Sequence, residues 1–208
     1  GVWIRRMGNE QPAWQPILDY WFGQADDGDC ANQKASLWWG KSPDIDADIR
    51  ERFEALRQLL INGGNRYWLQ FPESRLAAII TLDQFSRNIY RDTPTAFAAD
   101  QLALNWCVSG IEAGLDKQLR PIERVFFYLP MEHAEDLGMQ HRCLWQFQQL
   151  LEIVPDAHRE TFAGFADYAK QHMDVIERFG RFPHRNTVLR RQSTPAELEY
   201  LAQPGSGF

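Results

Sequence analysis

The sequence RLAAIITLDQFSRNIYRD, residues 75–92, is apolar on every side of a helix at its start and polar in its second half. Leu76, Ile79 and Leu82 leave no face for water, so this helix is expected to begin in the protein interior. A helix that is buried over its first half cannot easily turn its second half toward open solvent. The polar side chains that follow are therefore expected to be partly desolvated and to need partners. They are Asp83, Gln84, Arg87, Asn88 and Arg91.

The composition is that of a globular protein with an aromatic core. The chain has 208 residues, of which 44% are hydrophobic and 24% charged, and this fits one domain that needs no disulfide or metal to fold. Its eight tryptophans bring large apolar side chains to the core. The three cysteines, Cys30, Cys107 and Cys143, are far apart and form no CxxC pair. They are expected to be buried free thiols in a reducing compartment, which predicts a cytoplasmic location.

The charge pattern and the chain start exclude several classes of partner. The formal net charge is −6, and no lysine- or arginine-rich run is present, so binding to nucleic acid is not expected. No apolar run approaches the length of a membrane span, and the start lacks the apolar core of a signal peptide. Residues 1–10 begin with Gly1 and contain Met7, so they are expected to be a disordered or cloning-derived start. Residues 11–208 are expected to form a single all-helical domain.

Helical periodicity extends over almost the whole chain, and no stretch alternates as a strand does. The helix predicted over residues 42–64 has Ser42 as its N-cap, Pro43 at its first position and Gly63 at its end. Residues 24–33 are expected to be a loop, and the helix that starts at residue 120 is expected to stop before Pro130. Further helices are expected over residues 12–23, 73–91, 96–114, 131–155, 156–180 and 193–201. Short connections make neighbouring helices antiparallel, so the fold class predicted is all-α, with stacked helical hairpins.

Two later segments carry charges that could meet those of residues 83–91. The acidic segment, residues 129–141, is expected to place Glu132, His133, Glu135 and Asp136 on one helical turn. The basic segment, residues 177–186, supplies Arg181, His184, Arg185 and Asn186. One segment is acidic, one is basic and the third carries both signs. We therefore expect the three to converge on a single polar cleft.

Four long motifs carry a resemblance to a known family. They are WFG at residues 21–23, LDQFSRNIYR with TPTAFAAD over 82–100, RVFFYLPMEHAED at 124–136 and IERFGRFPHRNTVLRRQSTPAELEYL at 176–201. The sequence resembles the bacterial family called domain of unknown function 924, from about Ile17 to the C-terminus. The resemblance implies an all-helical fold similar to tetratricopeptide-type superhelices and implies no established activity. Ser86 stands where that family is expected to have proline, and this removes a possible helix kink.

Binding of a small anionic molecule or a peptide is the function that these residues favour. Arg87, Arg181 and Arg185 offer forked donors for a carboxylate or a phosphate, and Asn88 and Asn186 could orient it. A metal site is not expected. Glu132, Glu135 and Asp136 lack ligand spacing, and adjacent residues such as Glu132 and His133 point about 100° apart on a helix. No cofactor fingerprint is present.

Two alternatives remain open. In the first, the protein is an enzyme in which His133 or His184, with Glu132, acts as a proton carrier in the same cleft. No nucleophile motif accompanies them, so no reaction class follows. In the second, the arginines pair with Glu132, Glu135 and Asp136 and lock the hairpins of a protein-interaction scaffold. Tryptophans such as those at 38, 39, 68 and 106 would then be core residues or interface anchors.

Overall fold

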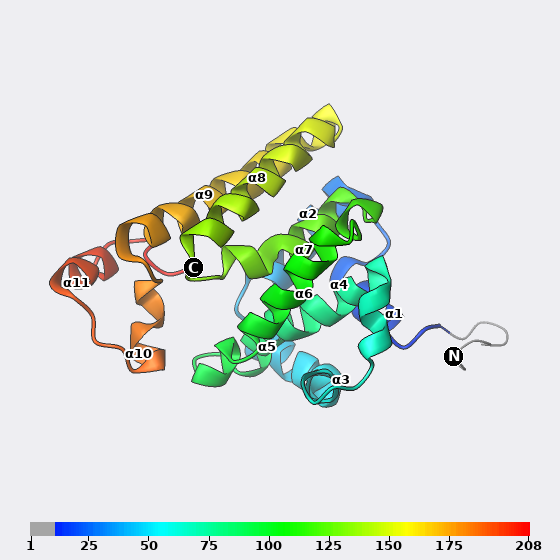
Figure 1. Cartoon of the computed structure of the whole chain (residues 1–208), viewed down its shortest axis with the longest axis horizontal. Helices are drawn as coiled ribbons and strands as arrows, with labels where there is room; N and C mark the ends of the chain where they lie inside the picture. Colours follow the sequence, from blue (N-terminus) through cyan, green and yellow to red (C-terminus); the bar gives the residue numbers. More distant parts are fainter. Residues whose placement is uncertain (1–10) are drawn as a thin grey trace.

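The computed structural model describes residues 11–208, and all of their regular structure is helical (Figure 1). The predicted all-α class is confirmed, whereas the expectation for residues 1–10 lies outside the described part of the chain. Across residues 11–208, no helix combines the length and the apolar character needed to cross a membrane. The α-helices are α1 Gln15–Phe22, α2 Asp27–Trp39, α3 Pro43–Ile61, α4 Pro72–Ile80, α5 Ser86–Ile89, α6 Asp100–Glu112, α7 Pro121–Glu132, α8 Leu137–Ile153, α9 Arg159–Phe179, α10 Asn186–Leu189 and α11 Pro195–Leu201.

Local capping explains where several helices begin. Ser42 is the N-cap of α3, and its hydroxyl accepts a hydrogen bond of 3.3 Å from the amide of Ile45. Thr194 caps α11 in a reciprocal arrangement with Glu197, in which each side chain accepts from the other's backbone amide at 3.1 and 2.9 Å. Both arrangements satisfy amide groups that a helix start leaves without partners.

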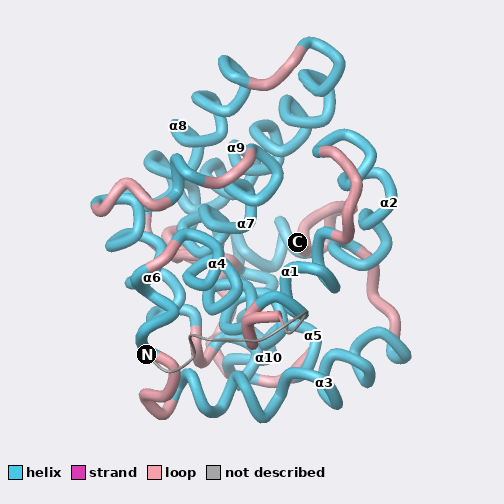
Figure 2. The backbone as a smooth tube through the Cα atoms, turned by 90° about the vertical axis from the view of Figure 1, so that its right-hand side faces the viewer, coloured by secondary structure: helices cyan, strands magenta, loops and turns pink. Residues whose placement is uncertain are grey.

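Two helices, α4 and α7, form the centre of the molecule. Every residue from 74 to 86 is buried, as the apolar periodicity predicted. Helix α4 contacts α1, α6 and α7, and α7 also contacts α2, α8 and α9 (Figures 1 and 2). The polar residues that follow α4 therefore enter the interior on a helix with no solvent face.

Helices α8 and α9 form a long antiparallel hairpin that lies against one end of α7 (Figures 1 and 2). They are joined by a short 3₁₀ turn, Asp156–His158, which agrees with the prediction that short connections give antiparallel neighbours. The likeness to a tetratricopeptide superhelix stays a prediction.

The loop predicted over residues 24–33 is wrong, because most of it belongs to α2. Asp26 is the N-cap of this helix and accepts a hydrogen bond of 2.9 Å from the amide of Asp29. Cys30 and Trp38 face the core, and the Trp38 indole donates to the carbonyl of Trp21 at 2.9 Å. The aspartates that suggested a loop are residues that favour a helix start, and burial of the apolar stripe then stabilises the helix.

Helix α7 continues through Pro130 to Glu132, so the predicted stop before Pro130 is also wrong. A proline inside a helix costs about 3 kcal/mol. Most of α7 is buried, and the apolar surface that it buries outweighs this cost. The predicted helix over residues 131–155 begins late as a result. Glu132 ends α7 and Asp136 caps α8. The acidic residues Glu132, Glu135 and Asp136 therefore do not share one helical turn, contrary to the prediction.

The helix predicted over residues 73–91 is interrupted by a π-helical turn, Thr81–Phe85, between α4 and α5. Such turns widen the helix by one residue and are frequent at functional sites. Asp83 and Gln84 lie on this turn, so their side chains are displaced from the positions that regular α-helical spacing would give them.

Ser86 provides the hydrogen-bond acceptor for a buried arginine. Its hydroxyl accepts a hydrogen bond of 2.7 Å from Arg57 Nε, and Arg57 is only 3% exposed. We expect Ser86→Ala to lower the free energy of unfolding by about 1–3 kcal/mol, because it leaves that donor buried without a partner. Denaturant unfolding measures the effect, with Ser36→Ala on the exposed face of α2 as the control. Equal stability of the two variants would contradict the prediction.

Candidate functional site

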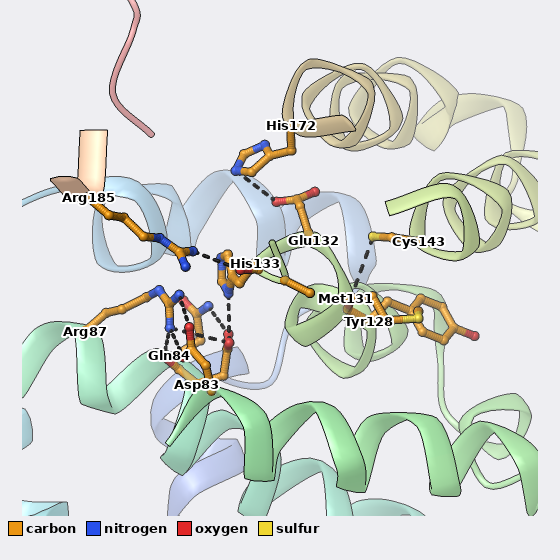
Figure 3. Close-up of polar contacts among 12 residues, drawn as sticks. Asp83, Gln84, Arg87, Tyr128, Met131, Glu132, His133, Cys143, His172 and Arg185 are labelled. Carbon is orange, nitrogen blue, oxygen red and sulfur yellow. Dashed lines mark hydrogen bonds and ion pairs between the residues drawn. The ribbon is translucent and has the colours of Figure 1, made fainter. Parts of the chain in front are cut away.

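A cavity of about 290 Å³ lies where the predicted charged segments meet. Its walls come from the end of α2, from α5, from the end of α7, from α9 and from the turn Pro183–Arg185. We refer to it as the His133 cavity. Seven of the predicted site residues line it: Arg87, Asn88, Arg91, Glu132, His133, His184 and Arg185. Asp83 lies directly behind His133 (Figure 3).

Asp83 and His133 form the closest polar contact of this site. His133 Nδ1 lies 2.7 Å from Asp83 Oδ1, and Gln84 Nε2 donates to Asp83 Oδ2 at 2.8 Å (Figure 3). Burial favours a higher pKa for Asp83, but His133, Arg87 and Gln84 outweigh it and lower the pKa to about 2. Burial, followed by Arg87, lowers the pKa of His133. An ionised carboxylate only accepts, so Nδ1 of a neutral His133 carries the proton and Nε2 is left as an acceptor.

Glu132 turns away from its neighbour His133 and toward α9 (Figure 3). Its Oε2 lies 3.9 Å from Nε2 of His172, and its side chain is buried. Burial, followed by the charge of Asp83, raises the pKa of Glu132 to about 8. Burial lowers the pKa of His172 to about 3. At neutral pH this pair is therefore an uncharged carboxylic acid beside an uncharged imidazole.

Two of the cavity arginines are neutralised by aspartates from other helices. Arg87 binds Asp100 of α6 through two hydrogen bonds of 2.8 and 3.0 Å, and it lies 3.5 Å from Asp83. Arg91 binds Asp46 of α3 at 2.8 and 3.0 Å, and Asn88 donates to the same carboxylate at 3.0 Å. The pKa values of both arginines are raised, that of Arg87 chiefly by Asp100 against its burial and that of Arg91 chiefly by its hydrogen bonds to Asp46.

Arg185 has a different environment from Arg87 and Arg91. Its guanidinium lies 4.6 Å from the ring centroid of Phe97 and 4.7 Å from that of Phe182. It donates to the carbonyl of His133 at 2.9 Å, while its Nε is buried without a hydrogen-bond partner in the described part of the chain, residues 11–208. Burial lowers the pKa of Arg185 to about 10 and that of the neighbouring His184 to about 4.

The remaining predicted site residues lie outside the cavity, and most of them hold the C-terminal segment in place. Glu135 binds Arg191 at 2.7 and 3.0 Å and accepts a hydrogen bond from the amide of Phe182. Arg181 binds Glu197 at 2.6 and 2.8 Å. Two others serve local structure: Asp136 caps α8, and Asn186 donates to Ser193. Of Glu132, Glu135 and Asp136, which were expected to pair with Arg87, Arg181 or Arg185, Glu135 pairs with a different arginine, Arg191. Arg87 and Arg181 pair instead with Asp100 and Glu197.

Aromatic side chains complete the cavity, and the sequence did not single most of them out. His172 and Phe208 stack with ring centroids 3.7 Å apart, and Tyr168 and Phe182 lie beside them. The tryptophans were predicted to be either core residues or interface anchors. Trp38 is a core residue, whereas Trp39 is 47% exposed and lines the cavity. A signal for His172 was present, since it falls on the apolar stripe of α9 with Ala169 and Ile176.

Among residues 11–208, no group of three or more histidines, cysteines and carboxylates is placed to hold a metal ion. The three cysteines are buried and free, as expected. The polar side chains on the cavity wall include arginines and histidines, the amides of Gln84 and Asn88, and the carboxyl groups of Asp92 and Glu132.

The sequence of this all-helical chain matches a known bacterial family. The family described as bacterial protein of unknown function (DUF924) matches residues 17–205, and this chain belongs to it. A solved structure of a protein of unknown function from Agrobacterium tumefaciens is 34% identical in sequence, with a TM-score of 0.77. The match covers 91% of this chain and 96% of that one. No match to this chain was found among curated proteins.

The raised pKa of Glu132 predicts a specific dependence of stability on pH. The folded state keeps the Glu132 proton up to about pH 8, whereas the unfolded chain releases it near 4.5. Glu132 therefore stabilises the fold fully only below about pH 4.5, and this contribution is lost as the pH rises to 8. We expect Glu132→Gln to unfold at a free energy about 1–4 kcal/mol above wild type at pH 8 and close to it at pH 5.

Denaturant unfolding of both proteins across pH 5–8 measures this difference. The charge of Asp83 also acts on Glu132 and His172 lies beside it, but both residues are common to the two proteins, so the difference isolates Glu132. Glu152→Gln on the exposed side of α8 is the matched control. Parallel pH curves for wild type and Glu132→Gln would show that Glu132 does not titrate in this range.

Proposed function

We propose that the protein binds a small organic anion in the His133 cavity, with Arg185 receiving its charge. The observation that carries this proposal is the state of Arg185, which is only 7% exposed. Within residues 11–208 no carboxylate lies close enough to form an ion pair with it, and its Nε has no hydrogen-bond partner. A buried cation without a counter-charge is costly, and a bound carboxylate or phosphate would offset that cost through charge-assisted hydrogen bonds.

A second unpaired nitrogen supports the same position. Nδ1 of His184, the residue next to Arg185, is also buried without a hydrogen-bond partner among residues 11–208. Buried polar atoms in folded proteins are almost always paired, so unpaired nitrogens on two consecutive residues of the cavity lining mark this side of the cavity as incompletely hydrogen-bonded without a ligand. The phenyl rings of Phe97 and Phe182 hold the guanidinium plane in a fixed orientation for that group.

In the competing hypothesis the polar cluster only stabilises the fold. This hypothesis explains Arg87, Arg91 and Glu135 but does not explain Arg185. Arg87 and Arg91 each have an aspartate partner, and Glu135 has Arg191. These pairs join separate elements and need no ligand. Arg185 does not fit this pattern. The cavity volume of about 290 Å³ is near the lower end for ligand sites, so it favours a small molecule over a peptide.

Arg185→Gln tests the anion site directly. We expect acetate and inorganic phosphate, titrated separately by calorimetry, to bind wild type and to bind Arg185→Gln at least about tenfold more weakly, because a hydrogen bond to a charged group contributes about 1.5–3 kcal/mol. Arg190→Gln, an exposed change in the same segment, should bind as wild type does. Absence of binding to wild type, or equal binding to all three proteins, would exclude Arg185 as the receptor of the anion.

Acid–base catalysis in the same cavity is a second candidate, and the contact between Asp83 and His133 favours it. Asp83 fixes the ring of His133 and its tautomer, which leaves Nε2 of an uncharged imidazole as a proton acceptor. Glu132, uncharged at neutral pH, is a possible proton donor on the same wall. Together they offer a base and an acid beside the proposed anion position.

Turnover of carboxylic esters and phosphate monoesters by wild type is the measurement for this second candidate. Any turnover found should fall by about 100-fold or more in His133→Gln, since positioned acid–base groups contribute about 10²–10⁴-fold. Anion affinity should change little, because Arg185 is retained. His141→Gln, an exposed histidine of α8, is the control. Turnover that survives equally in both variants would eliminate His133 as the base.

A further inference from the structure

A second cavity of about 330 Å³ lies on the other side of Glu132, between α7, α8, α9 and the end of α2. We refer to it as the Gly164 cavity. Its wall is largely apolar and is formed by residues such as Val125, Leu129, Phe147 and Phe165. It therefore offers a hydrophobic environment next to the charged one already described.

Three side chains line both cavities: Trp39, Glu132 and Tyr168. Trp39 and Tyr168 are large aromatic side chains that are 47% and 40% exposed. Glu132 is buried between the cavities, and burial raises its pKa, so at neutral pH it presents no charge to an apolar group passing it. The two cavities therefore adjoin at these three side chains, and Arg185 lines one of them whereas largely apolar side chains line the other.

Gly164 shows that the second cavity has room along α9. A Cβ atom added at this position meets no atom within 4 Å. Glycine in the middle of a helix is unfavourable relative to alanine, and here no close contact requires it. The absence of a side chain at 164 keeps the wall of the Gly164 cavity open beside Phe165 and Tyr168.

From this arrangement we infer that the ligand is a carboxylate with an apolar tail, whose head group binds Arg185 and whose tail lies in the Gly164 cavity. The inference rests on the proposed anion site and adds the chemical class of the ligand. A longer tail buries more apolar area against the walls of the Gly164 cavity, so the affinity for the ligand should rise with the length of its tail. The cavity at Arg185 supplies the charge recognition that a purely apolar pocket lacks.

A series of straight-chain carboxylates from acetate to octanoate, titrated into wild type by calorimetry below their micellar concentrations, tests the inference. Affinity should rise about fourfold for each added methylene until the tail fills the cavity, which is the fold-change that burial of one methylene produces. Octanoate that binds no more tightly than acetate would overturn the inference while leaving the anion site intact. No binding by any member of the series would instead show that the anion site itself fails.

Two substitutions at one exposed position locate the tail. Gly164→Phe fills the cavity, so it should abolish the gain with tail length and leave acetate binding unchanged. Gly164→Ala adds only a Cβ that meets nothing, so it should retain the full gain and melt no lower than wild type. Equal gains in both variants would place the tail elsewhere and overturn the inference.

The neutral probe octanol separates the two parts of the site. It should bind wild type and Arg185→Gln with the same affinity, because it carries no charge for the guanidinium. It should not bind Gly164→Phe. Octanol that fails to bind wild type would show that the Gly164 cavity does not accept an alkyl chain, whatever the behaviour of short carboxylates at Arg185.

Discussion

The burial of one carboxylate, that of Asp83, is the constraint on which the site depends. Asp83 is 1% exposed and lies on the π-helical turn that follows the fully buried helix α4. A charge in such a place must be compensated where it stands, because the helix has no face that turns toward water. His133, Gln84 and Arg87 provide this compensation. The contact with His133 joins the turn to the end of α7 and so fixes one wall of the cavity.

The other ion pairs extend from this centre and bring outer elements to the cavity. Arg87 connects to α6 through Asp100, and Arg91 connects to α3 through Asp46. On the opposite side, Glu135 binds Arg191 and the amide of Phe182, which sets the chain that leads to Arg185. Each of these charges is matched within the protein. Arg185 is held by the same framework but has no carboxylate partner among residues 11–208, and this contrast is the physical basis of the anion site that we propose.

Much of the fold could be predicted from the sequence. The cap of α3 at Ser42, the burial of residues 74–86 and the all-helical class follow from signals within one or two helical turns. The errors arose where a local signal had two meanings. The aspartates near the start of α2 favour both loops and helix starts, and Pro130 is unfavourable in a helix but is retained by the burial of α7 around it.

The sequence by itself determined that polar residues would be carried into the interior after α4, and it identified most of the charged residues that line the cavity. Only the tertiary structure decided which charges are matched. Asp83 meets His133 fifty residues away, and Arg91 meets Asp46 at a separation of 45. Periodicity reports which face of a helix is buried, because that depends on neighbours within a turn. Periodicity carries no information on which distant helix packs against that face. This packing decides which carboxylate each arginine meets, and it leaves Arg185 without a carboxylate partner among residues 11–208.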